Sequence, residues 1–455
     1  MTTKDKFKND LRGVGVIFII FLFWWSLVIY YFAFHQNNEN ESVQNTQKPA
    51  TRRAIYRISK RKFYVMTLEL QFPKWPTFGE AEEEAVREVV RSGQLFANQK
   101  VREFEKSFGK YIGTEHALGI GNATQGLHLC LAALGIGIGD EVIVTPYSWI
   151  STASCILMQN AIPIFCDIEE HTLGIDPDKI ERLITSRTRA IICVHMFGYP
   201  CKINEIKTIA KKHKLALIED ASHAHGAELN GKKIGTFGDI SAFSLHQRKA
   251  LSVGDGGIVC TNNASLAEKI YKMRSFGSNE LSYNYRMTEF AGALGSIRLQ
   301  KLDEHNDQRR KNSAFLNNLI TEKLSAFLEP LAVYPNSQTV HYANVLKITD
   351  KGAQSIDAEY LKLLEGSSFP IRRTWPPLHH HPNFNPGKNS RPARGLPWEL
   401  DTYDGKMRHT RYESLSLAVV EKLCPNRILE IYVHPPCAEK EMQTAFGHLQ
   451  RLFNQ

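Results

Sequence analysis

The chain has 455 residues, of which 43% are hydrophobic and 23% are charged. This ordinary composition excludes a disordered or fibrous chain, and the length favours two or three domains. The net charge of +9 is concentrated at the N-terminus, because residues 1–65 carry +7 and the rest of the chain only +2. The charge of the body therefore does not indicate a nucleic-acid-binding surface.

The eight cysteines contain no CxxC pair, and most lie in apolar, strand-like runs such as Ile162–Cys166 and Ala190–Val194. Cysteines in such runs behave as core residues rather than as a disulfide framework or a zinc site. We therefore expect free thiols in a reducing compartment.

Residues 13–34 form an uncharged stretch rich in Ile, Phe, Val and Trp. A helix of these 22 residues would span about 33 Å, enough for the ~30 Å hydrocarbon core of a bilayer, and the stretch is too long for a signal peptide. We expect an N-terminal tail over 1–12, a transmembrane helix over 13–34 and a polar, basic linker over 35–65. Basic residues flank both ends of the helix, so the charge rule leaves its orientation open. The basic residues of the linker are equally consistent with binding to an anionic cytoplasmic leaflet and with a solvated linker.

The predicted elements of the body begin with two amphipathic helices. The first runs over 79–92 and ends at Gly93, and apolar residues at helical spacing predict the second over 101–112. Short apolar strands then alternate with helical stretches, which predicts a mainly parallel sheet covered by helices on both faces. The expected strands are Glu141–Val144, Ile162–Cys166, Ala190–Val194, Leu215–Glu219 and Gly257–Thr261.

Beyond about residue 312 the pattern becomes irregular, with a proline-rich stretch over 370–386 and a final helix from Ala438. We expect a large α/β domain over 66–312 and a smaller C-terminal domain over 313–455. We also expect the N-terminal anchor to be dispensable for the chemistry of this body.

A glycine-rich loop runs into a helix over Gly119–His128. Free backbone N–H groups at a helix start bind phosphate, and Thr124 adds a hydroxyl. The glycine spacing is neither the dinucleotide fingerprint nor the P-loop. A tight turn that packs a helix on a sheet explains the loop equally well.

A carboxylate, Asp220, follows directly after an apolar strand. Ligands of parallel sheets bind at this end of the strands, and a carboxylate there costs desolvation energy unless it meets a cation. A protonated ring nitrogen of a cofactor would be such a partner. The alternative is an aspartate that caps the next helix.

A lysine, Lys249, lies between an apolar strand and a glycine-rich turn. Partial burial lowers the pKa of an ammonium group and frees the amine as a nucleophile, so Lys249 is a candidate Schiff-base lysine. Ser244 has a hydroxyl suited to a phosphate. The alternative is that Arg248 provides the local cation while Lys249 is exposed.

An aromatic side chain, Trp149, follows the strand Glu141–Val144. Its flat face suits stacking on a planar heterocycle, although a core tryptophan is an equally ordinary interpretation.

Taken in order, these segments resemble the DegT/StrS family of pyridoxal-phosphate (PLP) aminotransferases, which act mainly on keto groups of nucleotide-activated sugars or cyclitols. The resemblance runs from about Leu70 to the C-terminus and includes "GDEVIVTPYSWISTA", "IEDASHAHGA", "FSLHQRKALSVGDGG", "YNYRMTEFAGALG" and "WPPLHHHPNF". It implies the α/β PLP-transferase fold of type I, like aspartate aminotransferase. That fold has a mainly parallel sheet in a large domain and a smaller α/β domain.

The resemblance implies catalytic roles for Lys249 and Asp220. Lys249 matches the lysine that binds the cofactor covalently, and Asp220 matches the carboxylate that pairs with the pyridine nitrogen. His223 matches the residue beside the phenolate oxygen of the cofactor, and Trp149 matches the aromatic side chain that stacks on its ring.

The resemblance also implies a phosphate site made by Thr124, Gln125 and Ser244. Asn284 matches a residue lent to the phosphate site of the neighbouring subunit, which implies a homodimer with shared active sites. His379 matches a loop near the substrate.

The expected activity is transfer of an amino group from glutamate to a nucleotide-linked keto sugar, in surface-polysaccharide or amino-sugar biosynthesis. The alternatives are a keto-cyclitol aminotransferase with glutamine as donor and a non-catalytic membrane-bound protein of the same fold. The presence of Lys249, Asp220, Trp149 and Ser244 together favours the enzyme. Since nucleotide sugars and PLP are cytoplasmic, we expect a single-pass membrane protein with its catalytic body in the cytoplasm.

The chain departs from the family pattern at several positions. Ala123 stands where Gly is usual, Asp255 where Glu is usual, and Arg248 where small or apolar residues are usual. Arg248 lies beside Lys249, where it would alter the pKa of that lysine or recognise an acidic substrate. An insertion-like stretch covers 385–404.

The histidine triplet 379–381 raises the alternative of a metal site. Three consecutive histidines cannot all face one ion on a regular element, and the sequence shows no second ligand cluster. We therefore expect no metal.

Overall fold

The computed structural model describes residues 72–277, 282–367, 369, 371–385 and 412–455. These residues belong to one compact unit of the chain. The two predicted N-terminal helices are α3 (Glu80–Ser92) and α4 (Gln99–Ile112). α3 ends as expected at Gly93, whose φ of 65° lets its N–H bond to the carbonyl of Val90.

The localisation expected from the sequence is corrected by the structure. No helix of the described residues is both long and apolar enough to cross a bilayer. The longest, α11 (Leu302–Lys323), has 22 residues but carries eight charged side chains. The described residues therefore do not support the single-pass membrane protein expected from the sequence. The predicted transmembrane helix over 13–34 lies outside these residues.

Seven strands form the main sheet, in the order β1-β9-β8-β5-β4-β2-β3. β2, β3, β4, β5 and β8 are parallel, and only β9, between β1 and β8, runs antiparallel to its two neighbours. The five predicted strands are β2, β3, β4, β5 and β9, so the expected mainly parallel sheet is confirmed. The bounds are β1 (His116–Ile120), β2 (Glu141–Val144), β3 (Ile162–Phe165), β4 (Thr188–Val194), β5 (Ala216–Asp220), β8 (Ile240–Ser244) and β9 (Gly257–Thr261).

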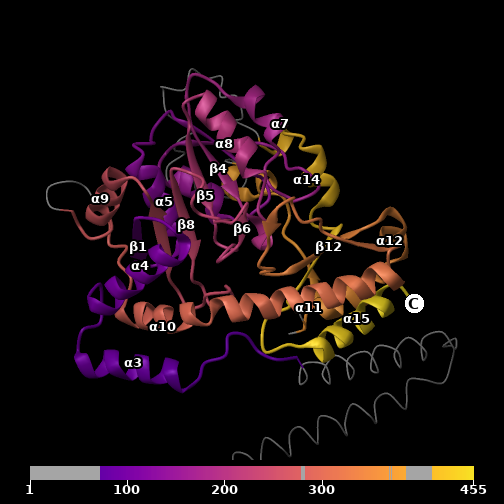
Figure 1. Cartoon of the computed structure of the whole chain (residues 1–455). Coiled ribbons are helices and arrows are strands. Elements are labelled where there is room, and N and C mark those ends of the chain that lie inside the picture. The colour runs from indigo at the N-terminus through magenta and orange to yellow at the C-terminus, as the bar shows by residue number, and fades with distance from the viewer. Residues whose placement is uncertain (1–71, 278–281, 368, 370, 386–411) are drawn as a thin grey trace, which may run out of the picture. The chain divides into compact units, whose positions relative to one another are not determined.

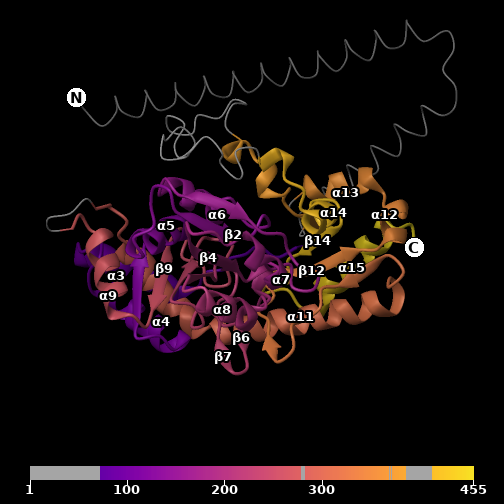
Figure 2. The same cartoon turned by 90° about the horizontal axis from the view of Figure 1, so that it is seen from above.

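Helices cover both faces of this sheet. Along β2, Val142 and Val144 belong to one buried cluster, while Ile143 between them belongs to the other, as the two-residue period of a strand requires. α5 (Ala123–Ala133) and α6 (Ser151–Met158) cover one face, and α4 and α8 (Ile203–Lys212) cover the other, as Figure 2 shows. Burial on both faces explains why the strands are nearly continuous apolar runs.

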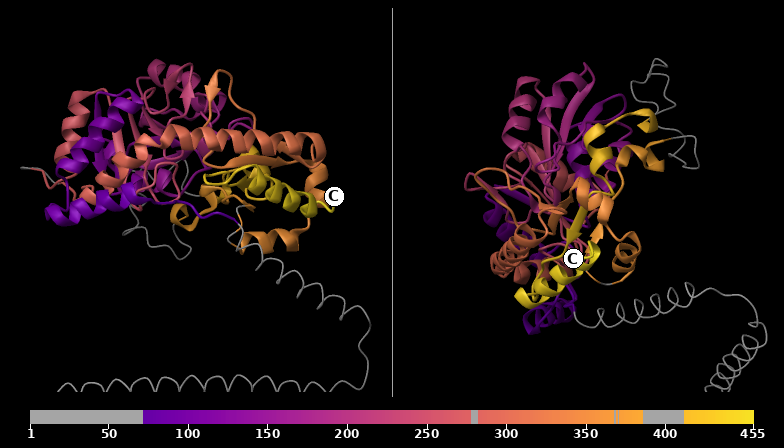
Figure 3. Two further views of the ribbon diagram at one scale, coloured as in Figure 1. Left: turned by 60° about the horizontal axis from the view of Figure 1, so that its bottom comes forward. Right: turned by 90° about the vertical axis from the view of Figure 1, so that its right-hand side faces the viewer.

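A second, antiparallel sheet lies in the C-terminal part of the chain. Its order is β10 (Leu328–Pro330), β12 (Asn344–Ile348), β14 (Ile428–Ile431) and β13 (Ile371–Arg373). A third buried cluster forms between this sheet, the second half of α11 and α15 (Glu439–Leu452), the predicted final helix. α11 runs without a break past residue 312 and reaches from the main sheet toward α15 (Figures 1 and 3).

The remaining helices are short, apart from α9 and α10, and the remaining strands form a three-stranded ribbon. They are α7 (Pro177–Ile180), α9 (Ala264–Met273), α10 (Glu289–Gln300), α12 (Asp350–Ser355), α13 (Ala358–Glu365), α14 (Ala418–Leu423), β6 (Glu228–Leu229), β7 (Lys232–Lys233), β11 (Ser337–Gln338) and the 3₁₀ turns η1 (Glu181–Leu183), η2 (Met196–Gly198), η3 (Leu378–His380), η4 (Pro382–Phe384) and η6 (Tyr412–Ser414).

Candidate active site

Three predicted site residues lie at the carboxyl ends of neighbouring strands, at what we call the carboxyl edge (Asp220, Ser244 and Lys249). Asp220 is the last residue of β5, Ser244 is the last residue of β8, and Lys249 lies in the turn between β8 and β9. β5 and β8 are parallel neighbours, with Asp220 opposite Ala242. The topology therefore gathers these side chains where α/β sheets bind ligands.

Asp220 is a buried carboxylate that neutral donors hold in place. Its Oδ2 accepts a hydrogen bond from Thr152 Oγ1 at 2.7 Å, and its Oδ1 accepts one from the N–H of Ser222 at 3.1 Å. Ser148 Oγ lies 2.7 Å from Thr152 Oγ1, which completes a relay of two hydroxyls. Among the described residues no cationic side chain forms an ion pair with Asp220, so the carboxylate is oriented but not neutralised.

Lys249 is placed close to Asp220 and has an altered pKa. Burial lowers the pKa of Lys249 to about 8, although the nearby charge of Asp220 acts in the opposite direction. Its Nζ lies 4.9 Å from the ring centre of Tyr342, and its backbone carbonyl accepts a hydrogen bond from Trp75 Nε1 at 3.1 Å. The lowered pKa increases the fraction of unprotonated amine near neutral pH, which favours a nucleophilic lysine.

His223 forms the centre of an aromatic stack. Its ring is parallel to that of Tyr342, with 4.2 Å between centres and an interplanar angle of 2°. The N–H of Phe197 donates to His223 Nδ1 at 3.2 Å, so Nε2 carries the proton. Burial, with the charge of Lys249, holds the pKa of His223 well below 6.5. His223 is therefore a neutral donor of fixed tautomer.

Trp149 is exposed over 56% of its surface, which contradicts the core-tryptophan interpretation. It meets Trp375 edge to face at 5.9 Å, and Trp375 stacks on Phe197 with an interplanar angle of 5°. The indole thus has an uncovered surface beside a rigid aromatic support.

The predicted phosphate residues lie at the first turn of α5. Asn122 caps this helix by accepting from the N–H of Gln125 at 3.0 Å, and Thr124 Oγ1 lies 2.7 Å from Ser151 Oγ. Gln125 Oε1 is buried without a hydrogen-bond partner in the described part of the chain.

The same helix start packs directly against β9, and this contact connects it to Ser244. Ser244 is paired with Gly257 across β8 and β9. A Cβ at Gly257 would lie 2.7–2.8 Å from the backbone of Asn122 and Ala123, so only glycine permits this approach. The close contact brings the Ser244 strand end beside the N–H groups of the helix start.

Asn284 and His379 are not part of this cluster in the single chain. Asn284 is exposed and pairs through its backbone with Ser275. His379 is fully buried, and its Nε2 bonds to Glu421 Oε1 at 3.0 Å. The turn that carries His379 is tied to the loop after β2, because the N–H of Leu378 donates to the carbonyl of Pro146 at 2.8 Å.

Sequence reasoning missed the wall opposite the carboxyl edge, which we call the small-sheet wall (Tyr342, Arg372, Glu430 and Tyr432). Arg372 Nε donates to Glu430 Oε1, and its guanidinium lies 4.7 Å from the ring of Tyr432. Tyr432 meets Tyr342 edge to face at 6.0 Å. Glu430 is 2% exposed, its Oε2 has no partner among the described residues, and burial raises its pKa.

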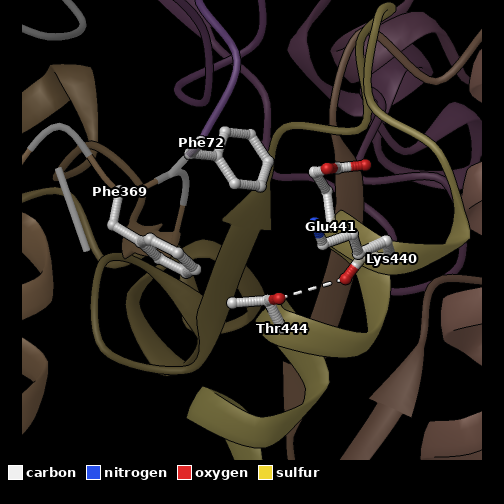
Figure 4. A pocket seen from close by; sticks show the side chains of 5 residues that line it. All are labelled: Phe72, Phe369, Lys440, Glu441 and Thr444. Atoms are coloured by element: carbon white, nitrogen blue, oxygen red, sulfur yellow. Dashed lines mark hydrogen bonds between the residues drawn. The ribbon is translucent and has the colours of Figure 1, made fainter. Parts of the chain in front are cut away.

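A pocket of about 380 Å³ is lined by other residues (Figure 4). It is lined by Phe72 and Phe369 and by the start of α15, where Thr444 Oγ1 donates to the carbonyl of Lys440 at 3.0 Å. No residue of the carboxyl edge lines it. This pocket is therefore not the candidate active site, which is defined by the side chains of the carboxyl edge.

The sequence model of the DegT/DnrJ/EryC1/StrS aminotransferase family matches residues 76–423. The chain belongs to this family. It is therefore a PLP-dependent aminotransferase of a family of sugar aminotransferases, and the predicted family, enzyme class and cofactor are confirmed.

Relatives and solved structures agree over most of the chain. The L-glutamine:2-deoxy-scyllo-inosose aminotransferase of Streptoalloteichus tenebrarius is 32% identical over 352 residues, which cover 71% of this chain and 82% of that enzyme. The spore coat polysaccharide biosynthesis protein SpsC of Bacillus subtilis is 33% identical over 328 residues, 68% of this chain and 84% of that protein. The structure of the aminotransferase from Psychrobacter cryohalolentis matches with a TM-score of 0.74 at 26% identity and covers 84% of this chain and 99% of that one.

The described geometry fits PLP. A protonated pyridine nitrogen supplies the cation that the buried carboxylate of Asp220 lacks. Lys249 offers an amine of lowered pKa for the aldehyde. The start of α5 offers N–H groups close to the strand end that carries Ser244.

Proposed function

We propose that this aminotransferase moves the amino group of L-glutamate to the ketone carbon of a nucleotide-linked sugar, in the synthesis of an amino sugar or a surface polysaccharide. The observation that carries the transamination is a buried carboxylate, Asp220, beside a lysine of lowered pKa, Lys249. The sugar is supported by the family and by relatives such as SpsC, whose name refers to polysaccharide biosynthesis.

In this proposal four side chains hold the PLP ring. Lys249 would bind its aldehyde carbon, and the negative charge of Asp220 would keep the pyridine nitrogen protonated. His223 donates Nε2–H to the phenolate oxygen, and Trp149 stacks on the ring face. Bound PLP withdraws electrons from the α-carbon of the donor, which lowers the barrier to loss of its proton.

The phosphate of PLP is proposed to bind at the start of α5. The N–H groups of the first helical turn and the hydroxyls of Thr124 and Ser244 point to an anion there. The side-chain amide of Gln125 would donate its N–H₂ group to a phosphate oxygen.

Lys249 is proposed to move the proton between the two carbons of the reaction. With PLP bound, the amine of Lys249 would accept the α-proton of the donor and return it at the second carbon. A pKa of about 8 is suited to both steps near neutral pH, because the proton is neither held too tightly nor released too early.

The proposal includes a homodimer with shared active sites. Asn284 is exposed and would complete the phosphate site of the partner. Close to it in the chain, Arg286 lies between two exposed rings, 4.7 Å from Phe96 and 4.8 Å from Phe276, which are each 60% exposed. Exposed aromatic rings around an arginine are typical of protein interfaces.

A second candidate substrate is a keto-cyclitol with L-glutamine as donor. It is supported by the 32% identity to the glutamine:2-deoxy-scyllo-inosose aminotransferase, of which this chain covers 82%. The two candidates share the same site chemistry and differ in donor and acceptor.

The experiment separates the two half-reactions. The PLP-loaded enzyme is mixed with L-glutamate or L-glutamine, and loss of the visible cofactor band is followed with formation of the keto acid. The aminated enzyme is then offered a nucleotide-linked keto sugar, the free keto sugar or 2-deoxy-scyllo-inosose, and the amine product is identified by mass spectrometry. The proposal expects glutamate to react and the nucleotide-linked sugar to be preferred, whereas reaction with glutamine and the cyclitol alone would replace it with the second candidate.

A further inference from the structure

Two groups of metal-ligating side chains converge in the described part of the chain, and one of them is closed. Cys193, His195 and Cys201 are fully buried. His195 Nε2 bonds to Glu219 Oε2 at 3.1 Å, and His195 Nδ1 accepts the N–H of Cys201 at 3.3 Å. Both ring nitrogens of His195 already have hydrogen-bond partners, and all three side chains are buried. We therefore interpret this group as two core thiols packed beside a histidine–glutamate pair.

The second group is open and lies where the sequence has its histidine triplet. His379 Nε2 lies 3.0 Å from Glu421 Oε1, and His380 Nε2 lies 3.8 Å from the same oxygen. The three ligand atoms all lie within 4.8 Å of one another. The side chains of His380 and Glu421 are 45% and 32% exposed, so an ion and its water ligands can enter from solvent.

The local backbone explains why adjacent histidines converge here. His379 and His380 lie in the 3₁₀ turn η3, and their rings are tilted by 42° with 4.0 Å between centres. On a regular helix or strand, the side chains of neighbouring residues point in different directions, whereas the short turn η3 brings these two rings together. His381 does leave the group, because its Nδ1 accepts the N–H of Asn383 and caps η4.

We propose that His379, His380 and Glu421 bind one divalent transition-metal ion, of which zinc is the natural candidate. Two imidazole nitrogens and one carboxylate oxygen are a zinc ligand set, with water in the fourth position. Zinc ligands at ~2.0–2.2 Å lie roughly 3.3 Å from one another in a tetrahedron. His379 Nε2 and Glu421 Oε1 lie 3.0 Å apart, close to this value, and His380 Nε2 is 3.8 Å from the same oxygen on an exposed side chain.

The surroundings of the ligands set the expected affinity. Glu421 is oriented by a second hydrogen bond, because its Oε1 also accepts the N–H of Leu417 at 2.9 Å. Zinc on His379 Nε2 moves the proton to Nδ1, which is buried without a partner among the described residues. A missing outer partner costs ~10–100-fold in affinity, so we expect micromolar rather than nanomolar binding.

The bound ion would act on the proposed active site through the backbone. It would join η3 to α14, which carries Glu421. η3 is already tied to Pro146 through Leu378, three residues before Trp149.

The test uses the PLP-loaded full chain, freed of metal by a chelator and titrated with Zn²⁺ by calorimetry. We expect one site per chain for the wild type and for the matched control H381A. H380A, which removes an exposed ligand, should bind more than ~100-fold more weakly, since outer-sphere changes alone cost ~10–100-fold. E421Q provides a second variant at the other element, and PLP absorbance of each variant reports folding.

Cobalt distinguishes the two candidate groups. Co²⁺ bound by nitrogen and oxygen ligands gives visible d–d bands without the intense near-ultraviolet absorption of a thiolate complex. The inference is overturned if H380A and E421Q bind zinc as the wild type does, if the wild type binds none, or if the cobalt complex shows thiolate absorption.

Discussion

The small-sheet wall approaches Lys249 of the carboxyl edge, but the two regions are built in different ways. At the carboxyl edge, Asp220 and Ser244 end parallel strands, and each position follows from its strand. In the small-sheet wall, Arg372 and Glu430 face each other across antiparallel strands that the chain reaches 58 residues apart. The carboxyl edge presents individual polar side chains at strand ends. The small-sheet wall contains an arginine–glutamate ion pair in which one oxygen of Glu430 has no hydrogen-bond partner among the described residues.

This difference separates the region expected to bind the cofactor from the region expected to adjust the reactivity of Lys249. In the proposed function the carboxyl edge binds PLP, so variants of its residues should abolish or strongly reduce turnover with any substrate. The small-sheet wall acts on Lys249 only through charge and through the ring of Tyr342. Its variants should tune the reaction and leave the cofactor bound.

The largest effect is expected from Lys249→Ala. The variant loses both the covalent attachment of PLP and the group that moves the proton, so kcat should fall by at least ~10³-fold. Turnover with saturating donor is the measurement, and added methylamine should restore part of it. A variant that retains a tenth of the wild-type rate would contradict the role of Lys249.

Asp220→Asn should follow with a loss of ~10²–10³-fold. The amide keeps the shape of the side chain but no longer holds the pyridine nitrogen protonated. The donor half-reaction, measured by stopped-flow absorbance, should slow while PLP stays bound. An unchanged half-reaction would separate Asp220 from the cofactor.

Thr152→Val should cost about 10-fold, because it removes a hydrogen bond of 2.7 Å to a charged oxygen. Thr152→Ser keeps the hydroxyl and is the matched control. Unchanged activity of Thr152→Val, or an equal loss in both variants, would contradict a specific role of the hydroxyl.

The smallest effects are shifts of pH dependence, and they test whether the small-sheet wall reaches the carboxyl edge. In the metal-free apoenzyme, the rate of covalent PLP attachment should rise with pH around a midpoint of about 8, where Lys249 loses its proton. The charge of Glu430 raises the pKa of Lys249 and that of Arg248 lowers it. Glu430→Gln should therefore move the midpoint to lower pH and Arg248→Leu to higher pH, each by a fraction of a unit. Shifts of the same sign would contradict this arrangement.

Sequence patterns predicted the carboxyl edge because its signals are local. A buried strand followed by Asp220, and a strand followed by Ser244 and a glycine-rich turn, can be recognised within a few residues. The parallel topology then brings such positions together without further information.

The small-sheet wall could not be predicted in the same way. Arg372 and Glu430 have no local pattern, because their pairing depends on the register between β13 and β14. The burial of Glu430 depends on tertiary packing, which no local sequence pattern reveals. The convergence of His379 with His380 was also missed, because a 3₁₀ turn brings together side chains that a regular helix or strand would separate.

The account depends most directly on the covalent bond between PLP and Lys249. Borohydride reduction of the purified, PLP-loaded enzyme, followed by peptide mass spectrometry, identifies the lysine that holds the cofactor. We predict one pyridoxyl-modified peptide, modified at Lys249, in the wild type and none in the Lys249→Ala variant. Modification of another lysine, or a modified peptide that persists in the variant, would contradict the assignment of this site.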